Sequence, residues 1–104
     1  MKRTRIKSIS KKRQGQMSIY HDLIEQIRPQ DNRSELSGEL PDWQSGGIVE
    51  AHHINGRIGT ELINARNIIF LTREEHAEIH AHNTYERKQE LLAIIEPIRK
   101  AQGW

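Results

Sequence analysis

The feature that most constrains the fold is the junction at residue 72, where a short apolar run meets the start of a helix. The run at residues 68–71 has the length and composition of a buried strand. The next four residues, Thr72-Arg73-Glu74-Glu75, form a capping box, in which the first and last side chains bond to the free N–H groups at a helix N-terminus. The sequence therefore predicts a strand that leads directly into a helix carrying His76 and His80.

A first helix is expected over residues 18–28. Its apolar residues recur at helical spacing between Ser18, which is placed to cap the helix, and Pro29, which lies just past its end. Residues 30–47 are rich in Asp, Asn, Ser, Gly and Pro, which predicts irregular structure with a short hairpin around residues 35–43.

The strand that precedes residues 68–71 is expected at residues 48–54. The loop between them, residues 55–66, is too long for a tight hairpin turn, and such structured excursions are often functional. After the histidine-bearing helix, Thr84 caps a last helix, in which Pro97 is expected to introduce a kink. The apolar stripe of this helix consists of Leu91, Leu92, Ile94, Ile95 and Ile98. Together these elements predict an α+β fold.

Charge divides the chain into an arm and one domain. Seven of the 16 basic residues and no acidic residue lie in residues 1–16, which predicts a basic, flexible arm, and residues 17–104 are long enough for a single domain. Such an arm suits a polyanion, because neutralising phosphates releases counterions. The chain has no cysteine, signal peptide or long apolar run, so we expect a cytoplasmic protein that does not enter a membrane.

The spacing of the histidines indicates a metal site with a base beside it. His76 and His80 are four residues apart on the expected helix and share one face, which lets two imidazoles bind one ion. His52 and His53 are adjacent on the expected strand and point to opposite faces. One of the strand histidines can therefore complete a three-nitrogen site, and the other remains free to accept a proton from water near neutral pH.

This pattern resembles the HNH (ββα-metal, His-Me finger) endonucleases, a resemblance that covers residues 48–82. Residues 53–59 and 67–71 also resemble small phage-type HNH proteins, which a phage or its bacterial host would encode. The shared features are a histidine pair, a central asparagine and a helical histidine pair, with spacing close to that of the colicin DNases: Ala51-His52-His53, Asn67, His76 and His80. The resemblance implies a core of a two-stranded antiparallel hairpin plus a helix. The N-terminal helix, the C-terminal helix and the basic arm expected from the sequence would flank this core.

Carried over by position, the resemblance implies that His53 activates the attacking water, while His52, His76 and His80 hold one divalent metal ion, which could be Mg²⁺, Mn²⁺, Ni²⁺ or Zn²⁺. Asn67 would fix the long loop and orient His53 through backbone hydrogen bonds. The implied reaction is hydrolysis of DNA phosphodiester bonds, with low sequence specificity and with 3′-hydroxyl and 5′-phosphate products.

The chain departs from many small HNH proteins in one respect. Those proteins flank the site with two CxxC knuckles that bind a structural zinc ion, and the matching positions in this chain are Ser34, Ser37, Thr72 and Glu75. None of these positions offers a thiolate, so a zinc knuckle is excluded. We therefore expect ordinary packing to hold the fold.

The expected partner is DNA, and RNA remains open as a substrate. Arg57 and Arg66 lie in and at the end of the loop, where a guanidinium could clamp a phosphate. Lys11, Lys12 and Arg13 of the arm would add sequence-independent contacts to the backbone.

Two other readings use the same residues differently. A nucleic-acid-binding module could keep this fold and metal while cleaving poorly, although such a module would not need His53. Alternatively, the chain could be a helical interaction protein, with the apolar stripe of the last helix as its dimer face and the histidines incidental. The nuclease itself could also form a homodimer through this helix, which would bring two sites together. His21 and His82 are expected to be ordinary surface residues.

Overall fold

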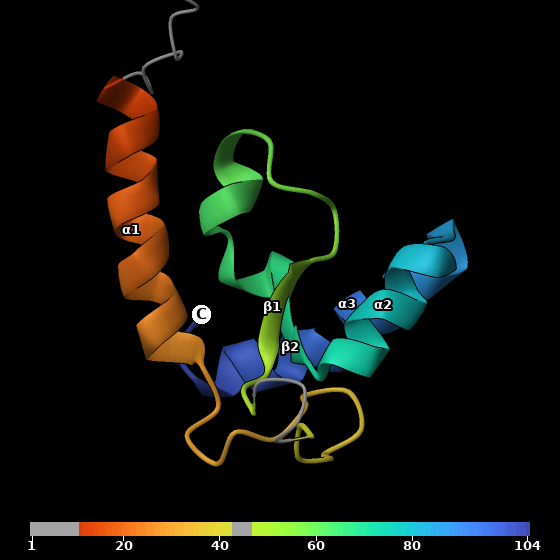
Figure 1. The fold of residues 1–104 in the computed structure, drawn as a ribbon. Coiled ribbons are helices and arrows are strands. Elements are labelled where there is room, and N and C mark those ends of the chain that lie inside the picture. Colours follow the sequence, from red (N-terminus) through yellow and green to blue (C-terminus); the bar gives the residue numbers. More distant parts are fainter. Residues whose placement is uncertain (1–10, 43–46) are drawn as a thin grey trace, which may run out of the picture.

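The computed structural model describes residues 11–42 and 47–104. In this part of the chain, three α-helices surround a two-stranded antiparallel sheet, so the fold class is α+β, compatible with a ββα layout (Figure 1). The elements in chain order are α1 (Lys11–Ile27), β1 (Glu50–His53), the 3₁₀ helices η2 (Gly59–Ile63) and η3 (Ala65–Asn67), β2 (Ile68–Leu71), α2 (Arg73–Ala81) and α3 (Tyr85–Ala101).

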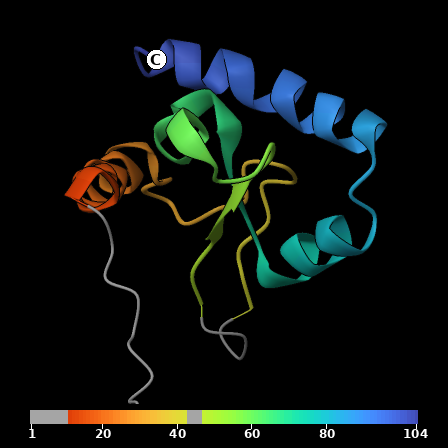
Figure 2. The same cartoon turned by 90° about the horizontal axis from the view of Figure 1, so that it is seen from above.

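Helices enclose the hairpin on several sides. In Figure 1, α1 and α2 stand on opposite sides of the strands, and in Figure 2 α3 runs along a further side, past η3. The expected loop after β1 is indeed structured, because η2 and η3 occupy most of it. Glu50 pairs with Leu71 and His53 pairs with Ile68, which fixes the register of the sheet.

The local signals at the helix starts are confirmed. The Thr72 hydroxyl accepts from Glu75 N, and the Glu75 carboxylate accepts from Thr72 N, so both halves of the capping box are formed. Thr84 caps α3 by accepting from Arg87 N, and α3 continues through Pro97. A strand is thus coupled directly to the histidine-bearing helix, as the sequence predicts.

The start of the first helix was predicted wrongly. Helix α1 begins at Lys11, seven residues before the expected start, so residues 11–16 are helical, and residues 1–10 lie outside the described part. Lys, Arg, Gln and Met are all good helix formers, and propagating an existing helix costs little. The added turns lie beside η2, where Gln16 Nε2 donates to Gly59 O.

The short hairpin expected around residues 35–43 is also absent from the part that the structure describes, because residues 28–42 contain turns and no strand. Glu35 instead pairs with the outer edge of β2: its backbone N donates to Phe70 O, and its Oε1 accepts from Phe70 N. Glu35 therefore forms hydrogen bonds with both the backbone N–H and the backbone C=O of Phe70 in β2.

The core lies on both faces of β2, since successive strand residues point to opposite sides. Ile68 and Phe70 pack toward Leu23 and Ile27 of α1. The other face packs Ile69 and Leu71 against residues of α2 and α3: Ile79, Leu91 and Ile95. The apolar stripe of α3 therefore contributes to the protein's own core, and a homodimer through this helix stays a prediction.

A buried ion pair joins three distant segments. Arg99 of α3 is fully buried and bonds to both carboxylate oxygens of Glu35, at 2.6 and 2.7 Å. The same guanidinium donates to the backbone carbonyls of Ala65 and Ile68, which precede and begin β2. Arg99 thus connects α3, the strand β2 and the irregular segment.

In the described residues, none of the helices has the length and apolar character that crossing a membrane requires.

Candidate metal centre and active site

Strand β1 separates the two adjacent histidines. His52 pairs with Ile69 and lies on the α2 side of the hairpin, whereas His53 pairs with Ile68 and lies on the α1 side. His52 is buried and His53 is half-buried. The alternation expected from the sequence therefore places the two imidazoles in different surroundings.

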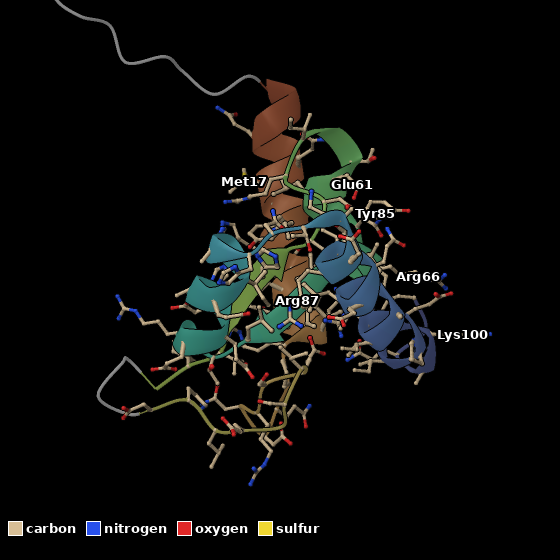
Figure 3. All side chains as sticks on the ribbon, turned by 90° about the vertical axis from the view of Figure 1, so that its right-hand side faces the viewer. Met17, Glu61, Arg66, Tyr85, Arg87 and Lys100 are labelled. Carbon is tan, nitrogen blue, oxygen red and sulfur yellow. The ribbon has the colours of Figure 1, made fainter. Side chains whose placement is uncertain are left out.

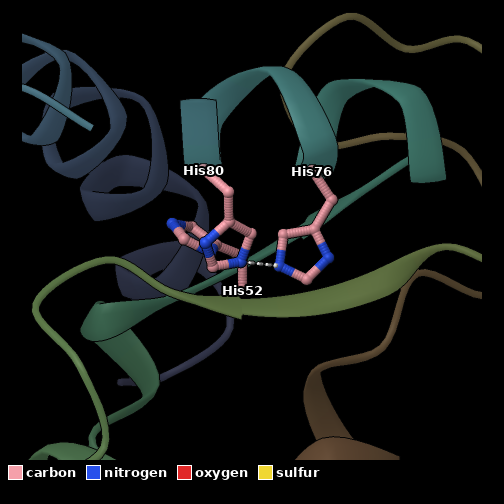
Figure 4. Close-up of side chains that lie close together, drawn as sticks. All are labelled: His52, His76 and His80. Carbon is pink, nitrogen blue, oxygen red and sulfur yellow. Dashed lines mark hydrogen bonds between the residues drawn. The ribbon is translucent and has the colours of Figure 1, made fainter. Parts of the chain in front are cut away.

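Three imidazoles converge on the α2 side. His76 and His80 project from one face of α2 toward His52 on β1 (Figure 4). One ring nitrogen from each of the three side chains lies within 4.8 Å of the others. These three histidines, which we call the imidazole cluster, could hold a metal ion.

The spacing of His76 and His80 and the chemistry of the imidazole cluster fit a divalent transition metal. A tetrahedral ion with metal–nitrogen bonds of about 2.0–2.1 Å separates its ligand atoms by about 3.3 Å, and the Nε2 atoms of His76 and His80 are 3.1 Å apart. Nε2 of His52 is buried and has no hydrogen-bond partner among the described residues. Such a buried polar atom is costly unless something binds it, and a cation would do so.

Burial also keeps His52 ready to act as a ligand. Desolvation, helped by His76 and His80, lowers the pKa of His52 to about 4. The ring is therefore neutral at physiological pH. A neutral imidazole is the form that donates a lone pair to a metal.

Glu50 is a functional candidate that the sequence reasoning missed. Its Oε1 accepts a hydrogen bond from His76 Nδ1 at 2.8 Å. That bond fixes the tautomer of His76, so the lone pair is on Nε2, the atom that faces His80. Glu50 lies two residues before His52 on the same face of β1, and this period-two spacing was the signal that could have revealed it.

On the α1 side, His53 has surroundings suited to a base. Its Nε2 lies 3.3 Å from Leu62 O, and its ring lies 5.4 Å from that of Tyr20, between centroids. Burial is the largest cause that holds the pKa of His53 below its usual value of 6.5; the Arg57 charge lowers it further, while Leu62 O and Glu61 oppose the shift. His53 is therefore mostly neutral at pH 7.

Asn67 ties the two ends of the long loop together. Its side chain is buried, and Oδ1 accepts from Asn55 N at 2.7 Å. Its Nδ2 donates to Gly56 O and to Glu61 O. These three bonds hold the segment that carries Leu62, the residue whose carbonyl faces His53.

Both sides of β1 open into one pocket of about 330 Å³, despite the separation of the two histidines. Arg57 contributes to this pocket. Arg66 does not line it, since its Nε donates to Trp104 O beside the end of α3, where Figure 3 shows it. The residues that line the pocket are Tyr20, Ala51, His52, His53, Gly56, Arg57, His76 and His80.

The remaining predicted positions lie elsewhere. Lys11, Lys12 and Arg13 are in the first turn of α1, and their side chains fall outside the described part. His21 is exposed on α1, and His82 is the exposed C-cap of α2. Neither of the last two joins the imidazole cluster.

The four positions that the resemblance places at a zinc knuckle, Ser34, Ser37, Thr72 and Glu75, lie together and are linked by hydrogen bonds. The Glu75 carboxylate bonds to the side chains of Ser34, Ser37 and Thr72. Ser34 Oγ also accepts from Leu36 N and Ser37 N, which closes its turn. This Glu75 network links the irregular segment to the start of α2.

The Glu75 network is expected to make stability pH-dependent. Burial alone raises the pKa of Glu75, but bonds from Ser34, Ser37 and Thr72 outweigh it and hold the pKa below its usual 4.5. Because the folded-state pKa is depressed, the stabilisation is present above about pH 4.5 and is lost as the pH falls through the folded value. Urea unfolding measured at several pH values should show a steeper acid loss for the wild-type protein than for Glu75→Gln. Glu86→Gln, in the first turn of α3, is the matched control, and equal acid losses in all three proteins would contradict the network.

The chain matches no protein-family model, no curated protein and no solved structure in comparisons with each.

Proposed function

We propose that the protein is a metal-dependent endonuclease of the HNH type, which hydrolyses phosphodiester bonds in DNA, with RNA as a second candidate substrate. One observation carries the proposal: three imidazoles placed so that they could hold a metal ion, and a fourth, separately held imidazole, line a single pocket. A structural metal site needs no free base beside it, whereas metal-dependent hydrolysis of a phosphodiester uses both a metal ion and a base.

His53 is the general base in this proposal. When its Nε2–H donates to Leu62 O, the lone pair is on Nδ1, which can accept a proton from a water molecule in the pocket. Because its lowered pKa keeps the ring neutral at pH 7, His53 can accept a proton without a second side chain to deprotonate it first. Asn67 supports this role by holding the loop that presents the Leu62 carbonyl.

His52, His76 and His80 hold the cation and leave open positions for phosphate and water, as three-ligand catalytic sites do. When bound, a divalent cation polarises the scissile phosphate and stabilises the charge that develops on the leaving 3′ oxygen. Imidazole ligands favour Ni²⁺ or Zn²⁺ by affinity, and Mg²⁺ and Mn²⁺ are candidates by availability. Glu50 keeps His76 oriented for ligation.

Nicking of supercoiled plasmid tests the proposal. We expect the wild-type protein to nick plasmid with at least one of Mg²⁺, Mn²⁺, Ni²⁺ and Zn²⁺, and to stop when a chelator is added. His76→Ala should lose this activity because it removes a ligand, whereas His82→Ala, at the exposed end of the same helix, should retain it. Intact plasmid with every metal would refute the proposal and favour the non-cleaving nucleic-acid-binding module.

A further inference from the structure

The pocket has a second wall that the proposed chemistry does not use. The imidazole cluster lies on one side, and Tyr20 of α1 and Arg57 of the long loop also line the space. Tyr20 comes from outside the hairpin and α2, so α1 takes part in the pocket.

Tyr20 contacts two charged or polar partners at once. Its ring lies 5.4 Å from the ring of His53, and the Arg57 guanidinium carbon lies 5.3 Å from the Tyr20 ring centroid. The second distance is within the range of a cation–π interaction. Tyr20 is itself held, because it is half-buried against the cluster that contains Leu23 and Ile27.

Arg57 is free to bind an anion. Within residues 11–42 and 47–104 its guanidinium forms no ion pair with a carboxylate; it lies over the Tyr20 ring, and its charge also acts on His53. A guanidinium held by an aromatic ring keeps its N–H groups available, and their fork matches two oxygens of a phosphate. The loop that carries Arg57 is held on one side by Asn67, whose Nδ2 donates to Gly56 O at 2.9 Å, and on the other side Gln16 Nε2 lies 3.5 Å from Gly59 O.

We propose that Tyr20 and Arg57 form the phosphate-positioning wall of the pocket: Arg57 binds a phosphate of the nucleic-acid backbone, and Tyr20 holds this guanidinium beside His53. Arg57 contacts the substrate directly, and Tyr20 acts through Arg57 and His53 as a positioning residue. The inference rests on the proposed function, since a phosphodiester is the anion that the pocket is proposed to receive. It also commits to a backbone contact, which carries no base specificity.

The salt dependence of DNA binding tests the phosphate-positioning wall in a protein that lacks the proposed base, so that binding is measured apart from cleavage. The His53→Ala protein, loaded with one equivalent of Zn²⁺, is titrated with a short DNA duplex at several salt concentrations. Adding Arg57→Ala should weaken binding and lower the slope of log Kd against log salt by about 1, as expected for one lost phosphate contact. Adding Arg33→Ala, on the irregular segment outside the pocket, should leave the slope unchanged.

Kinetics with His53 intact test the positioning role. Arg57→Ala should lower kcat/KM by about 10–100-fold, the range for one hydrogen bond to a charged group. Tyr20→Leu should lower kcat/KM by about 2–5-fold through the lost cation–π contact, and Tyr20→Phe, which keeps the ring, should recover most of that loss. Melting temperatures identify any variant that fails to fold. Because Arg57 is exposed and Tyr20 is half-buried, Arg57→Ala should disturb folding less than the Tyr20 variants.

The outcomes separate this inference from the proposed function. An unchanged salt slope in Arg57→Ala would overturn the phosphate contact even if the wild-type protein nicks plasmid. A reduced slope in a protein that never nicks plasmid would support the phosphate contact and refute the endonuclease. If Tyr20→Leu folds and matches the wild type while Arg57→Ala is impaired, Tyr20 has no positioning role.

Discussion

The His53→Ala protein is expected to cleave DNA about 10²–10⁴-fold more slowly than the wild-type protein, the usual contribution of one general base. The alanine removes the imidazole that accepts the proton of the attacking water. It leaves the imidazole cluster intact, because His53 lies on the opposite face of β1 from His52. Single-turnover cleavage at saturating metal measures the chemical step.

The control for this prediction is metal binding. Isothermal titration with Zn²⁺ should give the same affinity for His53→Ala and the wild type, and a lower affinity for His76→Ala. A His53→Ala protein that binds Zn²⁺ normally and cleaves within about threefold of the wild-type rate would contradict the general-base role, since a base normally contributes far more.

Replacing Arg99 with methionine is expected to destabilise the fold by about 3–5 kcal/mol, the usual cost of removing one partner of a buried ion pair. Methionine keeps much of the length of the side chain but leaves the Glu35 carboxylate buried without its bidentate partner. It also deprives the carbonyls of Ala65 and Ile68 of a donor. Urea unfolding followed by circular dichroism measures the free energy of unfolding.

Two further proteins make the Arg99 prediction specific. Lys100→Met, at the next and exposed position of α3, should change the free energy of unfolding by less than about 0.5 kcal/mol. The double variant Glu35→Gln, Arg99→Met should be more stable than Arg99→Met alone, because the glutamine removes the uncompensated charge. A cost for Arg99→Met as small as that of Lys100→Met would contradict the structural role of the ion pair.

The parts of the fold that the sequence predicted well are those with local signals. Strand β2 has the predicted bounds, residues 68–71, because four apolar residues end at a capping threonine. The helix that follows depends on the bond between Thr72 and Glu75, three residues apart. Likewise, the His76–His80 spacing fixes one helical face whatever the rest of the chain does.

The parts that could not be predicted depend on contacts between residues far apart in the sequence. Glu35 and Arg99 are separated by 64 positions, and nothing near either residue indicates the pair. The contact between the rings of Tyr20 and His53 likewise requires the packing of α1 beside β1. Arg66 is the opposite case. Its position at the end of the loop predicted a guanidinium that could clamp a phosphate at the site, but this guanidinium bonds to Trp104 O instead.

The central claim is that three imidazoles bind one cation while His53 stays out of the coordination shell. X-ray absorption at the zinc edge tests it most directly, in protein loaded with one equivalent of Zn²⁺. The account predicts three imidazole nitrogens at about 2.0–2.1 Å in the wild type and in His53→Ala, and fewer in His76→Ala. A spectrum in which His53→Ala loses an imidazole ligand, or in which His76→Ala loses none, would contradict the claim.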